Sequence, residues 1–281
     1  MEIFQTVEAF KDYTKAMKAA GKTIALVPTM GALHAGHIAL MEAARKAADV
    51  VIASVFVNPT QFGPNEDYEA YPRAFSEDCE KLKQVPVDAV FHPEPAALYP
   101  EGYATYVAVE GDITNKLCGA QRPGHFRGVA TVVTKLLHLA RADKAFFGQK
   151  DAQQLIIIKK MTRDLNFDIE IIGCPIVREK DGLAMSSRNA YLNPEERKAA
   201  TCLSKSIALG ESIIKKGLPA RELKDRMEKI IKGEPLAKMD YLEIVDLNTL
   251  QPVECINDSV LVAMAVHFGK TRLIDNFICE I

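Results

Sequence analysis

The stretch PTMGALHAGH, residues 28–37, decides the fold class, because it joins a β-rich run at residues 23–27 to a helix-like run at residues 38–48. Gly31 and Gly36 let the backbone approach a ligand closely, and the N–H groups at a helix start favour an anion. His34 and His37 are three residues apart, so we expect both on one side of the first helical turn. The pattern indicates a phosphate site faced by two imidazoles, although a tight turn with surface histidines would explain it equally well in isolation.

Outward from this stretch, strand-like and helix-like segments alternate. Apolar runs at residues 50–57, 87–91, 145–148 and 169–177 predict strands, and residues 75–84 and 150–166 predict helices. A further helix is predicted by apolar residues at i, i+3, i+4 and i+7 spacing between Val129 and Ala140. This alternation predicts an α/β fold with a Rossmann-like, doubly wound parallel sheet. Ligands of such sheets bind at the carboxyl ends of the strands.

The pattern changes after residues 181–182. Asn193-Pro194 and Pro219 are typical helix starts, and strand-like runs follow at residues 241–245 and 259–266. This helix-helix-strand-strand order predicts a smaller C-terminal α+β domain at residues 184–281. The Rossmann-like domain would then occupy residues 1–183, with residues 178–183 as the hinge.

Composition excludes several classes of function. The 281 residues carry a formal net charge of −2, which gives no broad footprint for nucleic acid or an acidic membrane surface. Six cysteines without a CxxC pair argue against a zinc site or a disulfide framework. The N-terminus lacks signal-peptide features, and the apolar runs are too short to span a bilayer. We therefore expect a cytoplasmic protein that binds small molecules, with no nucleic-acid or membrane partner.

Neutral and cationic groups follow other predicted strands. Asn58 and Gln61 come after the strand at 50–57, and their amides suit hydroxyl and carboxylate recognition; a solvated Asn-Pro turn is the alternative. Arg122 and His125 precede the helix at 129–140 and could meet an anion at its N-terminus, or form a surface cap. Lys150 follows the strand at 145–148 and can place a charge on phosphate. Asp151 can accept from ribose hydroxyls or cap the helix.

The segment MSSRN, residues 185–189, lies at the expected domain junction. It combines two hydroxyls with the guanidinium of Arg188, a set that suits polyphosphate oxygens. Ser-Ser-Arg is also common in ordinary loops, so this motif alone is weak.

Together these segments resemble the pantoate–beta-alanine ligase family over nearly the whole chain. The motifs that carry the resemblance are HxGH, NPTQFGPNEDYEAYPR, RPGHFRGVATVVTKL, FGQKDAQQL, KDGLAMSSRN and AVHFGKTRLIDN. HxGH alone is shared with the wider HIGH-motif nucleotidyltransferases and class I aminoacyl-tRNA synthetases, whose KMSKS-type triphosphate loop MSSRN resembles. The family commonly has Glu and Tyr where this chain has Gln149 and Ala152.

The resemblance implies a homodimeric ligase that uses ATP and Mg2+ and has no tightly bound organic cofactor. The carboxylate of (R)-pantoate would attack the α-phosphorus of ATP, giving pantoyl adenylate and pyrophosphate. The amine of β-alanine would then attack the activated carbonyl, releasing pantothenate and AMP. Because charge accumulates on the phosphoryl oxygens and the leaving pyrophosphate, the enzyme must supply fixed positive groups rather than a nucleophile.

The resemblance also assigns roles to residues. His34, His37 and Lys150 are the catalytic candidates, with His37 as the proton donor to pyrophosphate. The other expected ATP-binding residues are Met30, Gly31, Gly148, Asp151, Val177, Met185, Ser186, Ser187 and Arg188. Plain core packing is the less favoured alternative at the methionine and valine positions. Pantoate and β-alanine are expected to contact Gln61, Gln154 and Asn58, with Tyr71, Arg122 and His125 as weaker candidates. Metal ligands stay unassigned, and the segment Gly63 to Tyr71 is expected to close over the site.

Two rival hypotheses stay open. Another HxGH nucleotidyltransferase acting on a phosphorylated acceptor would need more cations in the acceptor pocket than Asn58, Gln61 and Gln154 provide. A catalytically silent nucleotide-binding module would bind ATP without releasing pyrophosphate, but it would not require His34, His37, Lys150 and Arg188 together.

Overall fold

A computed structural model describes residues 1–64 and 66–281, which fold as two compact units. Unit 1 comprises Met1–Val109, Arg122–Gln149 and Gln154–Pro175, and unit 2 comprises Glu110–Gln121, Lys150–Gln153 and Ile176–Ile281. Each unit has its own sheet. The functional domain division at residues 183 and 184 stays a prediction.

Unit 1 is built on a six-stranded parallel sheet in the order β1-β4-β3-β2-β5-β6. Its strands are β1 Glu2–Phe4, β2 Ile24–Thr29, β3 Val50–Val55, β4 Ala89–Phe91, β5 Lys144–Gly148 and β6 Glu170–Cys174. From β2 the chain adds β3 and β4 on one side and β5 and β6 on the other. The predicted doubly wound α/β sheet is therefore confirmed, with its reversal of strand order between β2 and β5.

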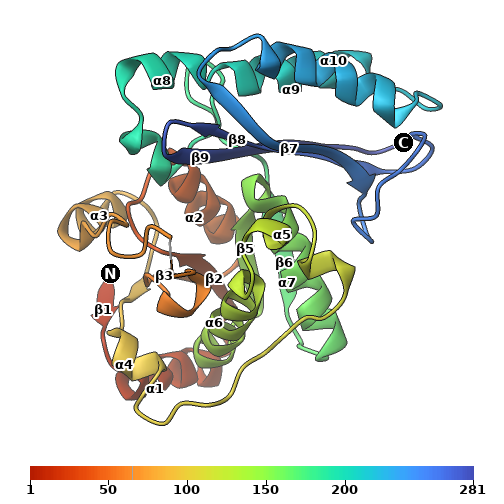
Figure 1. Cartoon of the computed structure of the whole chain (residues 1–281). Coiled ribbons are helices and arrows are strands. Elements are labelled where there is room, and N and C mark those ends of the chain that lie inside the picture. The colour runs from red at the N-terminus through yellow and green to blue at the C-terminus, as the bar shows by residue number, and fades with distance from the viewer. Residues whose placement is uncertain (65) are drawn as a thin grey trace. The chain divides into compact units, whose positions relative to one another are not determined.

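Helices cover both faces of this sheet. They are α1 Val7–Ala19, α2 Ala35–Ala47, α3 Phe75–Lys83, α4 Pro95–Leu98, α6 His125–Ala140 and α7 Ala152–Asp164, the last beginning in unit 2. Residues 25 and 27 of β2 pack against α2. Because side chains alternate along a strand, residues 24 and 26 face the opposite side, where α6 packs on β2 and α1 lies beside α6 (Figure 1). None of the helices among the described residues is long and apolar enough to cross a membrane.

Three elements of unit 1, β1, α1 and α4, were not predicted from the sequence. Helix α4 has four residues and buries only Leu98. Strand β1 has three residues, and α1 buries only Phe10 and Thr14. An element that buries so few side chains leaves almost no apolar periodicity to detect.

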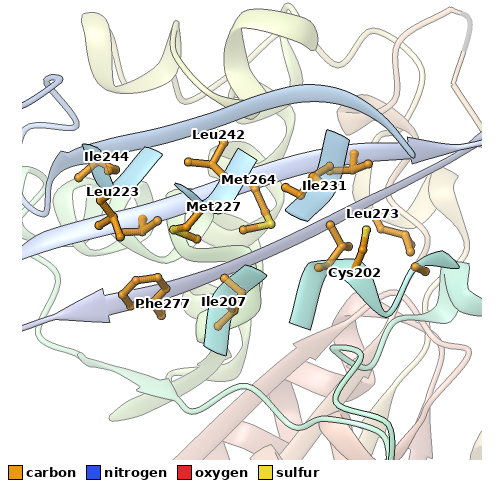
Figure 2. Close-up of a cluster of buried hydrophobic side chains, with 14 of the residues drawn as sticks. Cys202, Ile207, Leu223, Met227, Ile231, Leu242, Ile244, Met264, Leu273 and Phe277 are labelled. Atoms are coloured by element: carbon orange, nitrogen blue, oxygen red, sulfur yellow. The ribbon is translucent and has the colours of Figure 1, made fainter. Parts of the chain in front are cut away.

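Unit 2 contains a three-stranded antiparallel sheet, β7-β8-β9. Its strands are β7 Ala237–Asp246, β8 Val260–Phe268 and β9 Thr271–Cys279, and its helices are α5 Cys118–Gln121, α8 Pro194–Ala199, α9 Cys202–Ile213 and α10 Ala220–Lys232. Figure 2 shows the apolar core, in which Ile207 of α9 and Met227 of α10 face Met264 of β8 and Phe277 of β9. The smaller α+β fold is confirmed.

The predicted order of unit 2 is incomplete in two places. The first predicted helix starts as expected, with Asn193 as N-cap and Pro194 in first position, but the structure divides it into α8 and α9 around Thr201. Strand β9 was also missed, because Asp275 and Asn276 interrupt its apolar pattern although they are buried.

Candidate active site

The N-terminus of α2 carries the two histidines of the HxGH motif. His34 is the N-cap, and its Nδ1 accepts a hydrogen bond from Gly36 N at 3.1 Å. His37 is in the third helical position, and its Nδ1 accepts from His34 N at 3.2 Å. The ring centroids lie 4.1 Å apart. The helix begins at Ala35 rather than at residue 38. The two histidines, which were predicted to lie on one side of the first turn, therefore form a reciprocal cap.

This cap fixes the tautomer of both rings. A nitrogen that accepts from a backbone N–H cannot carry the proton of a neutral imidazole, so each neutral ring is protonated at Nε2. The first turn of α2 has no acidic residue. Two ring donors and the positive end of the helix dipole therefore meet in one place, which suits a phosphate group.

The turn before this cap is held by α3. Gly31 has φ +83° and Ala32 has φ +49°, both in the left-handed region. The buried carboxylate of Asp78 accepts from Ala32 N at 2.9 Å and Leu33 N at 2.7 Å. One turn further along α3, Lys81 Nζ donates to Leu33 O at 2.8 Å. A Cβ on Gly31 would lie 3.0 Å from Asp78 Oδ2, so the close approach requires glycine.

Asn58 and Gln61 meet at the carboxyl end of β3, within and just before the 3-10 turn η1 Pro59–Gln61. Asn58 Nδ2 donates to Gln61 Oε1 at 3.0 Å and to Gly128 O at 3.2 Å. Tyr99 OH donates to Asn58 Oδ1 at 2.8 Å. Because Gln61 Oε1 is an acceptor here, its Nε2 is turned toward Met30 Sδ, 3.2 Å away. Asn58 is thus a buried residue that orients the side chain of Gln61. The Nε2 of Gln61 is the group that can donate a hydrogen bond.

Arg122 and His125 support the same turn from the start of α6. Arg122 Nη1 is 3.0 Å from His125 Nε2, and His125 Nδ1 is 2.8 Å from Gln61 O. Since the guanidinium can only donate, Nδ1 of a neutral His125 carries the proton to Gln61 O. Arg122 also forms an ion pair with Glu66, with Nε 2.8 Å from Oε1.

The charge of Glu66 is set by this pair. Burial alone would raise the pKa of Glu66, but the hydrogen bond and charge of Arg122 outweigh it and hold the pKa below its ordinary value. Glu66 lies in the segment 63–71 that was expected to close over the site. Residue 65 of that segment lies outside the described residues, and the closing movement stays a prediction.

The remaining unit 1 candidates are Gly148, Gln154 and Tyr71. Gly148 ends β5, directly beside β2 in the sheet, and Gln154 is half-buried in the first turns of α7. Tyr71 is buried, with its ring 5.8 Å from that of Phe62. The carboxyl ends of β2, β3 and β5 thus bring Met30, Asn58 and Gly148 to one edge of the sheet, where doubly wound folds bind ligands.

Unit 2 contains the other candidates. Lys150 and Asp151 lie in the short 3-10 turn η3 Gln149–Asp151, so the helix predicted from Lys150 begins only at Ala152. Asn276 Nδ2 of β9 donates to Lys150 O at 2.8 Å. The backbone of Lys150 is therefore held by a strand of its own unit.

A hairpin presents the Ser-Ser-Arg loop. Met185 N donates to Val177 O at 3.0 Å, and residues 178 and 184 form an antiparallel bridge. Ser186 caps the turn η4 Ser187–Tyr191 by accepting from Arg188 N at 3.3 Å. The hairpin and η4 thus form one continuous segment. It carries the expected ATP-binding residues Val177, Met185, Ser186, Ser187 and Arg188.

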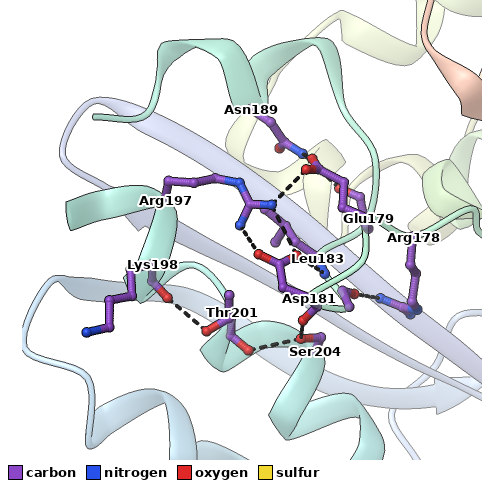
Figure 3. A network of polar contacts seen from close by, with 11 residues as sticks. Arg178, Glu179, Asp181, Leu183, Asn189, Arg197, Lys198, Thr201 and Ser204 are labelled. Carbon is purple, nitrogen blue, oxygen red and sulfur yellow. Dashed lines mark hydrogen bonds and ion pairs between the residues drawn. The ribbon is translucent and has the colours of Figure 1, made fainter. Parts of the chain in front are cut away.

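Polar contacts around the hairpin fasten it to α8 (Figure 3). Arg197 Nη2 is 2.7 Å from Glu179 Oε2, and its Nη1 is 2.6 Å from Asp181 Oδ2. Hydrogen bonding to Arg197 lowers the pKa of Asp181. Asn189 Nδ2 donates to Glu179 Oε1 at 2.7 Å. These contacts hold both ends of the loop.

Several supporting residues were missed from the sequence. Tyr99 lies far from Asn58 along the chain, and no local pattern links them. Asp78 left a signal: with Phe75, Cys79 and Leu82 it falls on the inward stripe of α3, where a carboxylate is unusual. Asp275 and Asn276 belong to the C-terminal motif LIDN, to which the resemblance assigns no role.

Comparisons with known proteins identify what the chain is similar to. Residues 2–278 match the family model described as pantoate-beta-alanine ligase. The chain is 54% identical over 282 residues to a pantothenate synthetase of Moorella thermoacetica, covering 100% of this chain and 99% of the relative. It also resembles the crystal structure of pantothenate synthetase from Thermus thermophilus, with a TM-score of 0.93, 44% identity and 99% of each chain covered.

A second similar structure was solved with ligands. It is pantoate-beta-alanine ligase from Francisella tularensis complexed with beta-gamma ATP and beta-alanine, with a TM-score of 0.81 and 35% identity. The match covers 99% of this chain and 97% of that one.

Proposed function

This chain belongs to the pantoate-beta-alanine ligase family, and from that premise we propose that it joins (R)-pantoate and β-alanine to form pantothenate with ATP as co-substrate. Pantoate first displaces pyrophosphate from ATP, giving pantoyl adenylate. β-Alanine then displaces AMP. The observation that carries the proposal is the capped N-terminus of α2, where the rings of His34 and His37 lie 4.1 Å apart at the positive end of a helix.

The residues of unit 1 divide between ATP on one side and pantoate and β-alanine on the other. His34 and His37 bind the α- and β-phosphates through Nε2, and His37 gives a proton to the departing pyrophosphate. Gln61 hydrogen-bonds pantoate and lies near β-alanine, Gln154 contributes to the pantoate pocket, and Asn58 fixes the amide of Gln61. These neutral amides suit the hydroxyl and carboxylate groups of pantoate better than a phosphorylated acceptor, which would need cations. The family and the pocket chemistry therefore both favour the ligase over another nucleotidyltransferase.

The residues of unit 2 bind the leaving group. Lys150 places a point charge on the phosphates, and Ser186, Ser187 and Arg188 hold the β- and γ-phosphates. The proposed adenosine-binding residues of unit 2 are Asp151, Val177 and Met185. Those of unit 1 are Met30, Gly31 and Gly148. Tyr71, Arg122 and His125 support the acceptor pocket, the last two through the carbonyl of Gln61.

Magnesium enters with the nucleotide in this proposal. Within the described ranges, 1–64 and 66–281, no group of three or more His, Cys, Asp or Glu residues is arranged to hold a metal ion. Mg2+ is commonly held by substrate phosphates and one or two carboxylates, keeping several waters. We therefore propose that the metal ion arrives bound to the phosphates of ATP. Lys150 and Arg188 share the phosphate charge with it.

The homodimer and the cytoplasmic location are part of the same proposal. The homodimer follows from the family resemblance. The cytoplasmic location follows from the six free thiols, which suit a reducing compartment. Sedimentation of the purified chain would measure the oligomeric state.

One assay tests the proposed function. AMP and pyrophosphate are measured with ATP and pantoate, with and without β-alanine. We expect about one equivalent of pyrophosphate per site without β-alanine, and continuous release of AMP and pantothenate with it. ATP binding without pyrophosphate release would identify a silent nucleotide-binding module, and turnover that requires a phosphorylated acceptor would identify a different transferase.

A further inference from the structure

Two consecutive polar side chains of β9 are buried without a role in the proposed chemistry. Asp275 is 1% exposed and Asn276 is 3% exposed. Successive side chains of a strand point to opposite faces of the sheet. Asp275 shares its face with Leu273 and Phe277 of the apolar core, so Asn276 lies on the other face. Burying two polar groups is unfavourable unless each has partners, and the partners identify what they hold.

Asn276 holds the backbone of Lys150. Its Nδ2 donates to Lys150 O at 2.8 Å. The other end of the short segment Lys150–Gln153 is held by Gln153, whose Nε2 donates to Ile113 O at 2.9 Å and Lys116 O at 2.8 Å. Side chains of its own unit thus fix both ends of the segment that carries the proposed catalytic lysine.

Asp275 holds the hairpin that presents the Ser-Ser-Arg loop. Its two oxygens accept from Arg178 Nη1 at 2.7 Å and Nη2 at 3.0 Å. Arg178 Nη1 also donates to Gly182 O at 3.1 Å, within the hairpin turn. Asp275 Oδ1 accepts from Asn276 N at 2.8 Å as well. The carboxylate therefore orders the hairpin and the backbone of Asn276 together.

We propose that Asn276 is a positioning residue that holds Lys150 for adenylation, and that Asp275 braces Asn276 and the hairpin leading to residues 186–188. The inference rests on the proposed function of Lys150. A lysine side chain is long and flexible, so where its ammonium can reach is set by its backbone. A displacement of about 1 Å at a catalytic group can lower a rate by roughly 100-fold.

A double-mutant cycle tests whether Asn276 acts through Lys150. The variants are Asn276→Ala, Lys150→Ala and the double variant of the full chain, and the readout is single-turnover formation of pantoyl adenylate. We expect Asn276→Ala to slow this step roughly 10- to 100-fold when Lys150 is present, but by less than about twofold in the Lys150→Ala background. The attack of β-alanine on pre-formed pantoyl adenylate should not change in rate, because pyrophosphate has already left.

Ser206→Ala is the matched control. Ser206 is fully buried in the same unit, and its hydroxyl donates to the carbonyl of Met227 at 3.0 Å. Removing this bond should lower the melting temperature about as much as Asn276→Ala but leave adenylation unchanged. If Asn276→Ala fails to fold, Asn276→Thr takes its place in the cycle, because threonine suits a strand and its hydroxyl is too short to replace the amide.

The outcomes separate this inference from the proposed function. Equal slowing of adenylation by Asn276→Ala in both backgrounds, or slowing of both half-reactions, would overturn the positioning role and leave the function of Lys150 intact. A wild-type adenylation rate in folded Asn276→Ala would do the same. A wild-type rate in Lys150→Ala would overturn the proposed role of Lys150, and the inference with it.

Discussion

At the scale of single residues, His37 combines a structural bond with a proposed catalytic one. Its Nδ1 caps α2 through His34 N, and Nε2 is the proposed donor to pyrophosphate. His37→Ala should lose about 0.5–2 kcal/mol of stability, as other capping residues do. Adenylation should fall roughly 10²- to 10³-fold, because the donor acts on charge that develops in the transition state. Rapid-quench single-turnover measurements would determine the rate.

The control for His37 is Glu196→Ala. Glu196 occupies the same third position in α8, and its carboxylate accepts from Asn193 N at 3.1 Å. It should lose similar stability while adenylating normally. A folded His37→Ala variant with a near-normal adenylation rate would exclude His37 as the donor.

Gln61 illustrates selectivity at the same scale. Gln61→Ala should weaken pantoate binding and the reaction with β-alanine by about 1.5–3 kcal/mol, the usual contribution of a hydrogen bond to a charged group, with ATP affinity nearly unchanged. The fold should tolerate the change, because Asn58 Nδ2 keeps its bond to Gly128 O. Calorimetric titration with each ligand would measure this. Equal losses for ATP and pantoate would place Gln61 outside the acceptor pocket.

The residue types at these positions could be predicted from the sequence, but their supports could not. HxGH, Asn58 and Gln61 lie in short motifs next to strand ends. The side chains that fix them, such as Asp78 and Tyr99, come from elements whose contacts arise only in the folded chain.

At the scale of elements, the packing of α6 on η1 depends on Gly128. A Cβ at this position would lie 2.2 Å from Thr60 O, so η1 would have to move. Gly128→Ala should therefore destabilise unit 1 by at least about 1–3 kcal/mol, the usual cost of overpacking, and should weaken pantoate binding because Gln61 belongs to η1. Urea unfolding would measure the stability, and calorimetry would measure the affinity for pantoate. His138→Ala, on the exposed side of the same helix, is the control, and wild-type stability of Gly128→Ala would contradict this packing.

The ion pair between the 63–71 segment and α6 should make stability depend on pH. The folded pKa of Glu66 is lowered, so its contribution is present above the unfolded value of about 4.3 and is lost as the pH falls through the folded value. Glu66→Gln should lose about 1 kcal/mol at pH 7, since the pair is partly exposed. Its unfolding free energy should then fall less steeply than that of the wild type between about pH 5 and pH 3.

Urea unfolding at a series of pH values would measure this dependence. Glu69→Gln, an exposed neighbour in the same segment, is the control and should follow the wild-type profile. Parallel profiles for Glu66→Gln and the wild type would show that the ion pair does not contribute to the pH dependence of stability.

Element prediction succeeded where burial was strong. Strand β3 is buried throughout and α6 carries a wide apolar stripe, so both were detected. Strand β9 was missed because its buried Asp275 and Asn276 are polar, and a sequence pattern cannot show that Arg178 and the Lys150 carbonyl satisfy them.

At the scale of the whole molecule, the sequence predicts two folded parts but not how segments distribute between them. Composition changes only after residue 181, whereas residues 110–121 and 150–153 fold with the C-terminal unit. These short segments belong to unit 2 through side-chain bonds such as Gln153 to Ile113 O. No local sequence signal marks contacts of that kind.

The place where unit 2 begins can be tested with two fragments. A fragment of residues 176–281 keeps Arg178, whereas a fragment of residues 184–281, the predicted domain, leaves Asp275 without its guanidinium. The Asp275 side chain is 0% exposed, and removing one partner of a buried ion pair costs about 3–5 kcal/mol. The shorter fragment should therefore be less stable by roughly that amount. Urea unfolding followed by circular dichroism would measure the difference.

Two variants of these fragments separate charge from chain length. Both fragments lack residues 110–121 and 150–153 equally, so their difference isolates residues 176–183, which form most of the hairpin. Introducing Asp275→Asn into residues 184–281 removes the stranded charge and should restore part of the lost stability, whereas the same change in residues 176–281 should destabilise, because it leaves Arg178 without its carboxylate. If Asp275→Asn had the same effect in both fragments, the hairpin would not stabilise unit 2 through this pair, and residue 184 would be an adequate domain boundary.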